Sequence, residues 1–398
     1  MTWKEVNVEQ QRKKFINLYL SNKSTIAELC RQFDISRPIA YKWIHRYEQD
    51  GWDGLKDRSS APKTQAMAIS TDMETEILAV KLAYIKWGPK KVKSILEKEN
   101  PIVKWPSGTT IGKIFERNGL TIPRKLRRRL AERQSPLINC QQCNDTWCID
   151  FKGWFVTIDN HKCDPFTVTD AFSRYLLNCF KLEAGNTKHV WGVFDRLFRE
   201  YGLPHYVRSD NGSPFATTGT ARLSSLSVKL IKAGVMPEWI DPGKPQQNGR
   251  HERMHLTMQQ ECVFPELTLD EQQMKFNEFI NYYNFIRPHE ALGQKSPSEI
   301  YHPSNRVWNG KLQSPEYSNE YIIGKVRDCG KMAWKGGDIY IGRVLGGEPI
   351  GIKTNTEGVL TAHYGPIYLG TIEDGGLIVT RRKSRAKRNV SYIVEKSV

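Results

Sequence analysis

The chain has 398 residues, 39% of them apolar and 26% charged, so it can build ordinary folded cores and is not wholly disordered. Lys and Arg outnumber Asp and Glu by 59 to 43, and the resulting net charge of +16 indicates a polyanionic partner, nucleic acid first. Apolar runs stay short of the roughly 20 residues of a membrane span, no signal-peptide pattern opens the sequence, and eight cysteines in this length do not make a disulfide scaffold. These features exclude a secreted or membrane protein and predict a cytoplasmic one of two to four domains.

The first 60 residues are predicted to be helical. Their hydrophobic pattern predicts helices over Val8–Leu20, over Thr25–Phe33 and from Ser36 onward. Ser24 and Ser36 are candidate N-caps, because a serine oxygen can accept from the unpaired N–H groups of a first helical turn. The short connection before the third helix is typical of a helix-turn-helix.

The third of these helices is the candidate DNA-reading helix. Its spacing predicts a buried stripe formed by Ala40, Trp43 and Tyr47. The residues left facing outward, which suit a helix in the major groove, are Arg37, Tyr41, Lys42 and Arg46. The alternative is a small helical bundle whose surface is merely basic.

A second helical region follows a small, polar linker at residues 59–69. The predicted helices are Met73–Tyr84, Lys90–Glu99 and Thr110–Asn118, the last ending at Gly119. They predict a second helix-turn-helix. A basic run comes next, and between DNA-binding modules we expect it to contact phosphates; its members are Arg124, Lys125, Arg127, Arg128 and Arg129.

The pattern changes from about residue 144, where short strands replace helices. Strands are predicted over 146–151, 166–170, 174–181 and 205–210, with helices over 187–201, 246–261 and 269–284. This order indicates a mixed α/β sheet. Beyond residue 315, short strands separated by Gly-rich turns predict a small all-β, barrel-like domain, and residues 381–388 form a basic arm.

Three acidic residues stand out in the α/β region. Asp150 interrupts an apolar strand, Asp210 closes another, and Glu252 lies one turn into a predicted helix. A buried carboxylate without a partner is costly, so Asp150 needs a cation, a partner or an exit to solvent. Three such carboxylates could hold two divalent cations ~3.5–4 Å apart. Oxygen ligands of this kind favour Mg²⁺.

The sequence around these residues resembles a known family. Asp150 is followed by DNG at 210–212, by PQQNGRHE ending at Glu252, and by YNFIRPHEALGQKSPSEIY at 283–301. This combination resembles the DDE transposases of bacterial insertion sequences, which share the retroviral-integrase core. The resemblance covers nearly the whole chain, and its core motifs are highly specific in combination.

The resemblance implies a multidomain architecture. Helix-turn-helix modules at 1–60 and 61–132 precede an RNase H-like α/β integrase core at 140–302, a small β-barrel domain at 315–380 and a basic tail at 381–398. It also implies that Asp150, Asp210 and Glu252 are catalytic metal ligands for Mg²⁺, with Mn²⁺ able to substitute. One departure concerns the 41 residues between Asp210 and Glu252, longer than in many relatives. Residues 217–227 are expected to be the extra loop.

The implied function is that of a transposase. Such an enzyme binds double-stranded DNA at the ends of a mobile element and catalyses Mg²⁺-dependent cleavage and strand transfer. Relatives act as homo-oligomers that bring two ends together, here in the cytoplasm with the nucleoid. The rivals are a transcriptional regulator on a catalytically silent integrase-like scaffold, which two helix-turn-helix units would suit, and a nonspecific nuclease, which would not need them.

Several other polar residues have competing interpretations. Basic and amide groups beside Glu252 are expected to contact the DNA strand being cut; they are Lys244, Asn248, Arg250 and Arg253. His251 and His255 have the one-turn spacing of a zinc pair, but surface or phosphate-contacting roles are favoured.

Cys140 and Cys143, with His161 and Cys163, leave a zinc site open. Asp170 is interpreted as a turn residue that binds its own backbone. Trp147 is expected in the core, and Glu261 lies too far along its helix to share the metals.

Overall fold

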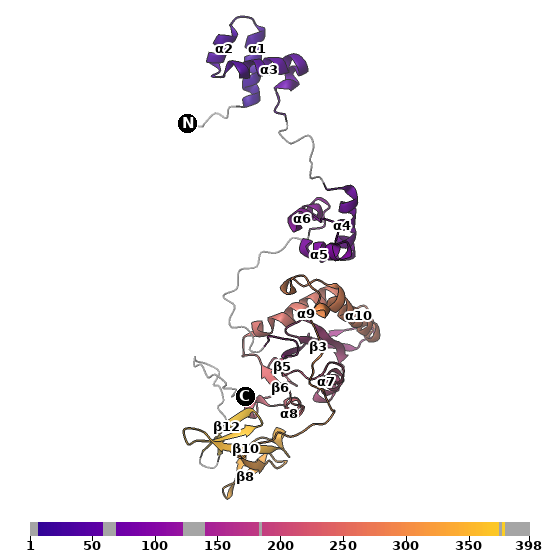
Figure 1. Cartoon of the computed structure of the whole chain (residues 1–398), viewed down its shortest axis with the longest axis vertical. Helices are drawn as coiled ribbons and strands as arrows, with labels where there is room; N and C mark the ends of the chain where they lie inside the picture. The colour runs from indigo at the N-terminus through magenta and orange to yellow at the C-terminus, as the bar shows by residue number, and fades with distance from the viewer. Residues whose placement is uncertain (1–6, 59–68, 122–139, 183–184, 374–375, 379–398) are drawn as a thin grey trace. The chain divides into compact units, whose positions relative to one another are not determined.

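The computed structural model describes residues 7–58, 69–121, 140–182, 185–373 and 376–378 (Figure 1). The chain separates into two compact units, residues 1–71 and 72–398. None of the helices in the described ranges is both long and apolar enough to cross a membrane. The predicted basic run at 124–129 and the basic tail at 381–398 lie outside the described residues.

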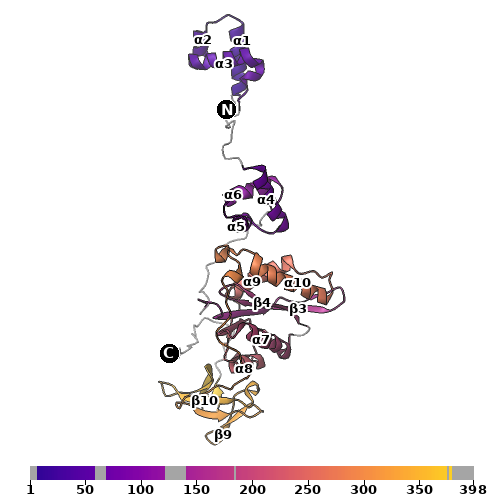
Figure 2. The ribbon, with the colours of Figure 1, turned by 45° about the vertical axis from the view of Figure 1, so that its right-hand side comes forward.

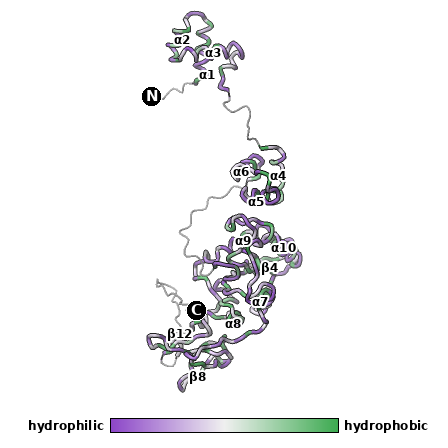
Figure 3. The backbone as a smooth tube through the Cα atoms, in the orientation of Figure 1, coloured by the Kyte–Doolittle hydropathy of each residue, from purple (hydrophilic) through white to green (hydrophobic). Residues whose placement is uncertain are grey.

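The first unit is a helical bundle. It consists of α1 (Val8–Leu20), α2 (Ile26–Gln32), α3 (Arg37–Asp50) and the 3₁₀ turn η1 (Gly51–Leu55). Polar and apolar residues alternate along these helices (Figure 3), because each buries one face. Phe15, Ile16, Leu29 and Ile44 are among the buried residues that form the core.

The caps of these helices differ from prediction. Thr25, not Ser24, caps α2, and it forms a reciprocal capping box with Glu28. The Ser24 prediction is therefore wrong by one residue. Ser36 does occupy the N-cap position of α3, but its side chain makes no cap hydrogen bond.

The second unit opens with three helices, α4 (Thr71–Ala83), α5 (Pro89–Glu99) and α6 (Gly108–Arg117). They match the predicted helices to within two residues at each end. As expected, α6 buries Ile111, Ile114 and Phe115 on one face. Gly119 follows the helix with φ +68°, a conformation that glycine adopts readily.

A six-stranded mixed sheet forms the centre of the second unit. Its strands are β1 (Thr146–Phe151), β2 (Phe155–Val156), β3 (Lys162–Asp170), β4 (Leu176–Leu182), β5 (Tyr206–Ser209) and β6 (Met236–Trp239). The order is β2-β3-β1-β5-β6, with β4 also paired to β3. β3 is antiparallel to β1 and to β4, whereas β5 is parallel to β1 and β6 to β5. The mixed α/β sheet predicted from the sequence is confirmed.

Helices cover both faces of this sheet, with α9 and α10 on one side of β3 and β4 and α7 and α8 on the other (Figure 2). The helices are α7 (Thr187–Tyr201), α8 (Ser225–Lys232), α9 (Gly249–Glu261) and α10 (Leu269–Asn281). Short turns accompany them: η2 (Thr220–Arg222), η3 (Pro245–Asn248), the π turn η4 (Tyr282–Ile286), η5 (Glu290–Leu292) and η6 (Pro297–Glu299). The loop predicted at 217–227 is wrong in part, because η2 and the start of α8 lie within it.

The C-terminal part is built from strands. β13 (Gly376–Ile378), β12 (Ile367–Glu373), β11 (Leu360–Tyr364), β10 (Pro349–Thr354) and β7 (Ile322–Lys325) form an antiparallel sheet in that order. β8 (Lys331–Trp334) and β9 (Gly337–Tyr340) form a hairpin, and η7 (Arg343–Leu345) follows it. The apolar core of this part also includes Leu223, Val228 and Ile231 from the segment around α8, so these strands share a core with the α/β region.

Candidate active site

The strand register brings two of the three acidic residues level with each other. Parallel pairing aligns Thr146 of β1 with Tyr206 of β5, and Cys148 with Arg208. Continuing this register by two residues sets Asp150 opposite Asp210, which directly follows β5. An Asp210 carboxylate oxygen (Oδ1) accepts a hydrogen bond of 3.0 Å from the Gly212 N–H, which holds the turn in place.

The third acidic residue comes from α9, which packs against β1. The face of α9 that meets the sheet is buried and includes His251, Met254 and His255. Glu252 and Arg253, on the same turn, are exposed. The helix thus places Glu252 at the edge of the buried surface, next to the sheet that carries Asp150.

The electrostatics link the three carboxylates. Burial, together with the negative charges of Asp210 and Glu252, raises the pKa of Asp150 to about 7. Lys152, a residue that the sequence analysis missed, acts in the opposite direction. Sites short of positive charge favour a bound cation. Across the described ranges, however, no three His, Cys, Asp or Glu side chains are arranged closely enough to hold a metal ion, so the carboxylates are neighbours rather than a closed ligand set.

Two buried histidines lie behind this cluster, which corrects the expectation that they face solvent or phosphate. His251 and His255 are only 1% and 6% exposed. Their Nε2 atoms lie 2.7 and 2.6 Å from the hydroxyl of Thr167 on β3, and Nδ1 of His251 lies 2.7 Å from the Thr169 hydroxyl. Their polar side chains suggested a place at the surface. In the structure, the two histidines instead form hydrogen bonds that join α9 to β3.

The hydrogen bonds of Thr167 determine the histidine tautomers. The Thr167 hydroxyl donates its single proton to the backbone carbonyl of Asp150, at 3.0 Å. It must therefore accept from both histidines, so each carries its proton on Nε2. Nδ1 of His251 then accepts from Thr169, and Nδ1 of His255 presents a lone pair 3.8 Å from an Asp150 carboxylate oxygen.

Both histidines are neutral in the folded protein. Burial, together with the positive charge of Lys152, lowers the pKa of His255 to about 3. Burial also holds the pKa of His251 well below its usual value. The close approach of His255 to Asp150 is therefore not an ion pair, and the network fixes the backbone of Asp150 through Thr167.

The four residues expected to contact DNA near Glu252 have different environments. Arg253 is exposed, and Lys244 is half-buried and pairs with Asp241 at 3.1 Å. Arg250 is exposed but donates to the carbonyl of Ala171, at 2.9 Å. Asn248, at the junction of η3 and α9, is only 4% exposed, which argues against the DNA contact expected for it.

Three other interpretations from the sequence can be compared with the structure. Trp147 is fully buried in the main core, as expected. Asp170 is the last residue of β3, and its carboxylate accepts from the N–H of Ser173 in the following turn, as expected. It also accepts from the N–H of Asn144, and burial raises its pKa. Glu261 pairs with Arg287 at 2.8 Å, at the far end of α9 from Glu252.

Within the described ranges, Cys140, Cys143, His161 and Cys163 are not gathered into a group of three that could hold a metal ion. Cys140 Sγ accepts from Arg250, and Cys143 Sγ lies 3.4 Å from the carbonyl of Ile300. Cys163 is fully buried in a different apolar cluster, with α9 and α10.

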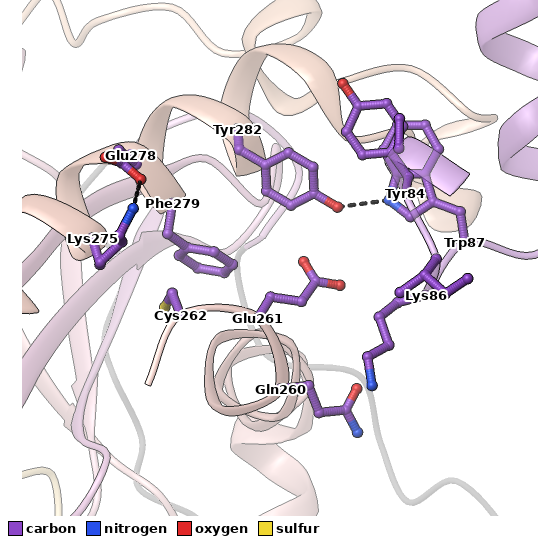
Figure 4. Close-up of a pocket in the computed structure, with 12 residues that line it drawn as sticks. Tyr84, Lys86, Trp87, Gln260, Glu261, Cys262, Lys275, Glu278, Phe279 and Tyr282 are labelled. Carbon is purple, nitrogen blue, oxygen red and sulfur yellow. Dashed lines mark hydrogen bonds and ion pairs between the residues drawn. The ribbon is translucent and has the colours of Figure 1, made fainter. Parts of the chain in front are cut away.

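A cavity of about 350 Å³ lies at the C-terminal end of α9, beside α4 and α10 (Figure 4). Tyr84 stacks on Trp87 with ring centroids 4.0 Å apart, and the Trp87 N–H donates to the Tyr282 hydroxyl at 2.6 Å. Glu261 borders the same space. The sequence analysis did not predict this contact, and Asp150, Asp210 and Glu252 do not line the cavity.

In the first unit, the predicted DNA-reading face is mostly open. Arg37, Tyr41 and Lys42 are exposed on α3. Arg46 is half-buried because its guanidinium lies 4.9 Å from the ring centre of Trp43. Ala40 and Trp43 are buried as expected, whereas Tyr47 is only partly buried.

Comparison with known proteins gives matches in both units. Models of the integrase core domain match residues 141–245 and 233–297. A helix-turn-helix domain matches residues 11–63, and a homeodomain-like domain matches residues 39–115. The catalytic core of HTLV-2 integrase in complex with magnesium aligns with 41% of this chain and 99% of its own, at 16% identity and a TM-score of 0.33.

Two curated relatives are proteins of bacterial insertion elements. An uncharacterized 39.2 kDa protein of IS476 from Xanthomonas euvesicatoria is 26% identical over 244 residues, 60% of this chain and 65% of that protein, which is less than two thirds of its length. An uncharacterized 31.7 kDa protein of IS407 from Burkholderia multivorans is 26% identical over 245 residues, 58% of this chain and 82% of the relative.

These matches define the chain as an integrase core protein that also carries helix-turn-helix domains. It is similar to uncharacterized proteins of two bacterial insertion elements.

Proposed function

We propose that this protein is a transposase that cleaves DNA at the ends of a mobile element and joins them to target DNA. The observation that carries the proposal is the electrostatic grouping of three carboxylates from β1, the end of β5 and α9. The integrase core matches over residues 141–297 support the same reaction class. The proposal includes an RNase H-like fold for residues 140–302 and a barrel-like fold for residues 315–380.

The donor chemistry of these residues fits a divalent cation, although the three described side chains do not form a closed ligand set. Burial and two neighbouring negative charges raise the pKa of Asp150, and the three side chains supply only hard oxygen donors. Asp150, Asp210 and Glu252 would hold Mg²⁺, or Mn²⁺ in its place, with two ions proposed. Bound there, the metal would activate the attacking oxygen and stabilise the leaving oxygen of an in-line displacement.

The chain's own residues position this chemistry. Thr167 and the two histidines hold the Asp150 backbone, and the Gly212 N–H holds the Asp210 carboxylate. Exposed Arg253 can neutralise a DNA phosphate beside Glu252. Lys152 contributes positive charge near Asp150.

We assign recognition of the element ends to the N-terminal modules, proposed at 1–60 and 61–132. The exposed Arg37, Tyr41 and Lys42 suit a helix in the major groove of double-stranded DNA. The basic residues at 124–129 and in the tail at 381–398 add charge for phosphates. We further propose that the protein acts as a homo-oligomer that brings two element ends together, in the cytoplasm with the nucleoid.

The test is cleavage and joining of DNA that carries the element ends, with Mg²⁺ and with EDTA. Wild type should cut and join only with the metal, and Asp150→Asn and Glu252→Gln should lose at least a hundredfold in rate. Glu266→Gln, which changes an exposed carboxylate outside the cluster, is the matched control and should keep full activity. Full activity of Asp150→Asn would refute the site, and DNA binding without cleavage under all conditions would favour a regulator.

A further inference from the structure

The segment between Asp210 and Glu252 contains an unusual turn. Two consecutive residues of η2 that carry a Cβ, Ala221 and Arg222, have φ +48° and +59°. The left-handed region is unfavourable for such residues, and positions of this kind persist only where the surroundings hold them. The turn lies within residues 217–227, where the resemblance led us to expect an extra loop.

Contacts from the C-terminal strands hold one side of the turn. The Thr220 hydroxyl donates to the carbonyl of Ile341, just after β9. η2 also packs against β12, and fully buried Leu223 lies in the core of the C-terminal sheet. Within the turn, the Arg222 carbonyl accepts from the Thr217 N–H at 3.0 Å.

The other side of the turn reaches the proposed catalytic loop. Arg222 Nη1 donates to the Asn211 side-chain oxygen at 2.8 Å, and Asn211 Nδ2 donates to the carbonyl of Ile240 at 2.8 Å. Asn211 directly follows Asp210, so the position of Arg222 bears on the Asp210 turn. The hydrogen bonds thus run from the C-terminal strands through Thr220 and Arg222 to the residue beside Asp210.

α8 makes this connection stiff, because it belongs to two cores. Leu226 and Leu230 pack in the core of the central sheet, whereas Val228 and Ile231 pack with the C-terminal strands. At the end of α8, Lys232 pairs with Glu348 at 2.6 Å, with side chains 21% and 11% exposed. A shift of the C-terminal strands would therefore move α8 and η2 together.

We propose that Arg222 is a positioning residue, through which the C-terminal β-sheet sets the geometry of the Asp210 turn. The turn thereby makes the C-terminal strands part of the active-site framework, in addition to any role in binding DNA. The catalytic consequence rests on the proposed function, whereas the physical coupling does not.

The test compares full-length wild type with Arg222→Ala, Arg222→Lys and Thr220→Val. Hydrogen exchange of the Gly212 amide, which donates to the Asp210 carboxylate, reports the turn directly. Loss of one exposed hydrogen bond should speed that exchange about fivefold in Arg222→Ala and Thr220→Val. Mn²⁺ affinity should fall by a similar factor, and Arg222→Lys should recover part of both effects.

Two controls separate positioning from folding. Arg327→Ala removes a different exposed arginine contact, the ion pair with Asp338 of β9, and should change neither measurement. Asn211→Ala removes the acceptor instead, so adding Arg222→Ala to it should have no further effect on Gly212 exchange. If Arg222→Ala is too unstable to study, the pair Thr220→Val and Asn211→Ala decides the question.

The outcomes are distinguishable. Unchanged Gly212 exchange and unchanged Mn²⁺ affinity in the folded variants would overturn the positioning role, even if wild type cuts DNA. Faster exchange in the variants, combined with no DNA cleavage by wild type, would uphold the coupling and refute the proposed function.

Discussion

The hydroxyl of Thr167 connects three groups beside the candidate site, so its removal is a sharp test of the local structure. Thr167 is fully buried, donates to the Asp150 carbonyl and accepts from His251 and His255. Valine has nearly the same shape, so Thr167→Val leaves no cavity but removes all three hydrogen bonds. The change in stability therefore reports the loss of the hydrogen bonds and not a loss of packing.

The magnitude follows from the groups left unpaired. Two buried imidazole N–H donors lose their acceptor, at about 1–3 kcal/mol each, so Thr167→Val should destabilise the second unit by about 3 kcal/mol. Thr169→Val is the graded control, because it removes only the hydroxyl that donates to His251 Nδ1 and should cost about 1 kcal/mol.

Hydrogen exchange of the β1 and β3 amides is the suitable measurement, because the chain has more than one folding unit and a single melting transition would mix them. A loss of about 3 kcal/mol speeds exchange by roughly a hundredfold or more. Exchange within a factor of two of wild type in Thr167→Val would refute both the network and the tautomers deduced from it.

Three further predictions concern other parts of the chain. Burial, together with the charges of Lys91 and Arg287, lowers the pKa of His289 to about 3, so the unfolded chain gains a proton below pH 6.5 that the folded chain does not. His289 should therefore lower the free energy of unfolding by about 2 kcal/mol between pH 7 and pH 5. In His289→Gln, the free energy of unfolding should fall by about 2 kcal/mol less than in wild type over the same pH range. Glu348→Ala removes the partner of Lys232 from a largely buried ion pair. The opening free energy measured by hydrogen exchange at the β10 and β11 amides should fall by about 3 kcal/mol, and no change would contradict the pairing. Lys42→Ala should weaken DNA binding and reduce the slope of log affinity against log salt by about 1, and an unchanged slope would exclude a phosphate contact.

Elements with one buried face were predictable from the sequence. α1 and α7 match their predicted bounds, and β1 was identified in full, because one hydrophobic period dominates each of them. The order of strands and helices also indicated the mixed sheet. The positions of Asp150, Asp210 and Glu252 on separate elements followed from the same patterns.

α8 was missed for a physical reason. It buries five of its eight residues, against two different cores, so its apolar positions form no single stripe. Its N-terminus is rich in serine, which is typical of a loop, although Ser224 and Ser227 form a capping box there. A helix that is buried on two sides has no clear amphipathic signal.

The histidines were misjudged for a different reason. Their partners, Thr167 and Thr169, lie more than 80 residues earlier in the chain, on β3. Spacing along one helix says which residues share a face, but not what that face meets. The buried network therefore required the fold.

The central claim is that Asp150, Asp210 and Glu252 together bind a divalent cation, and calorimetric titration with Mn²⁺ tests it most directly. The titration belongs at pH 8, because a carboxyl with a pKa of about 7 is mostly ionised there. Wild type and the Glu266→Gln control should bind, whereas Asp150→Asn, Asp210→Asn and Glu252→Gln should each lose at least tenfold in affinity. Equal binding by wild type and these three variants would contradict the account.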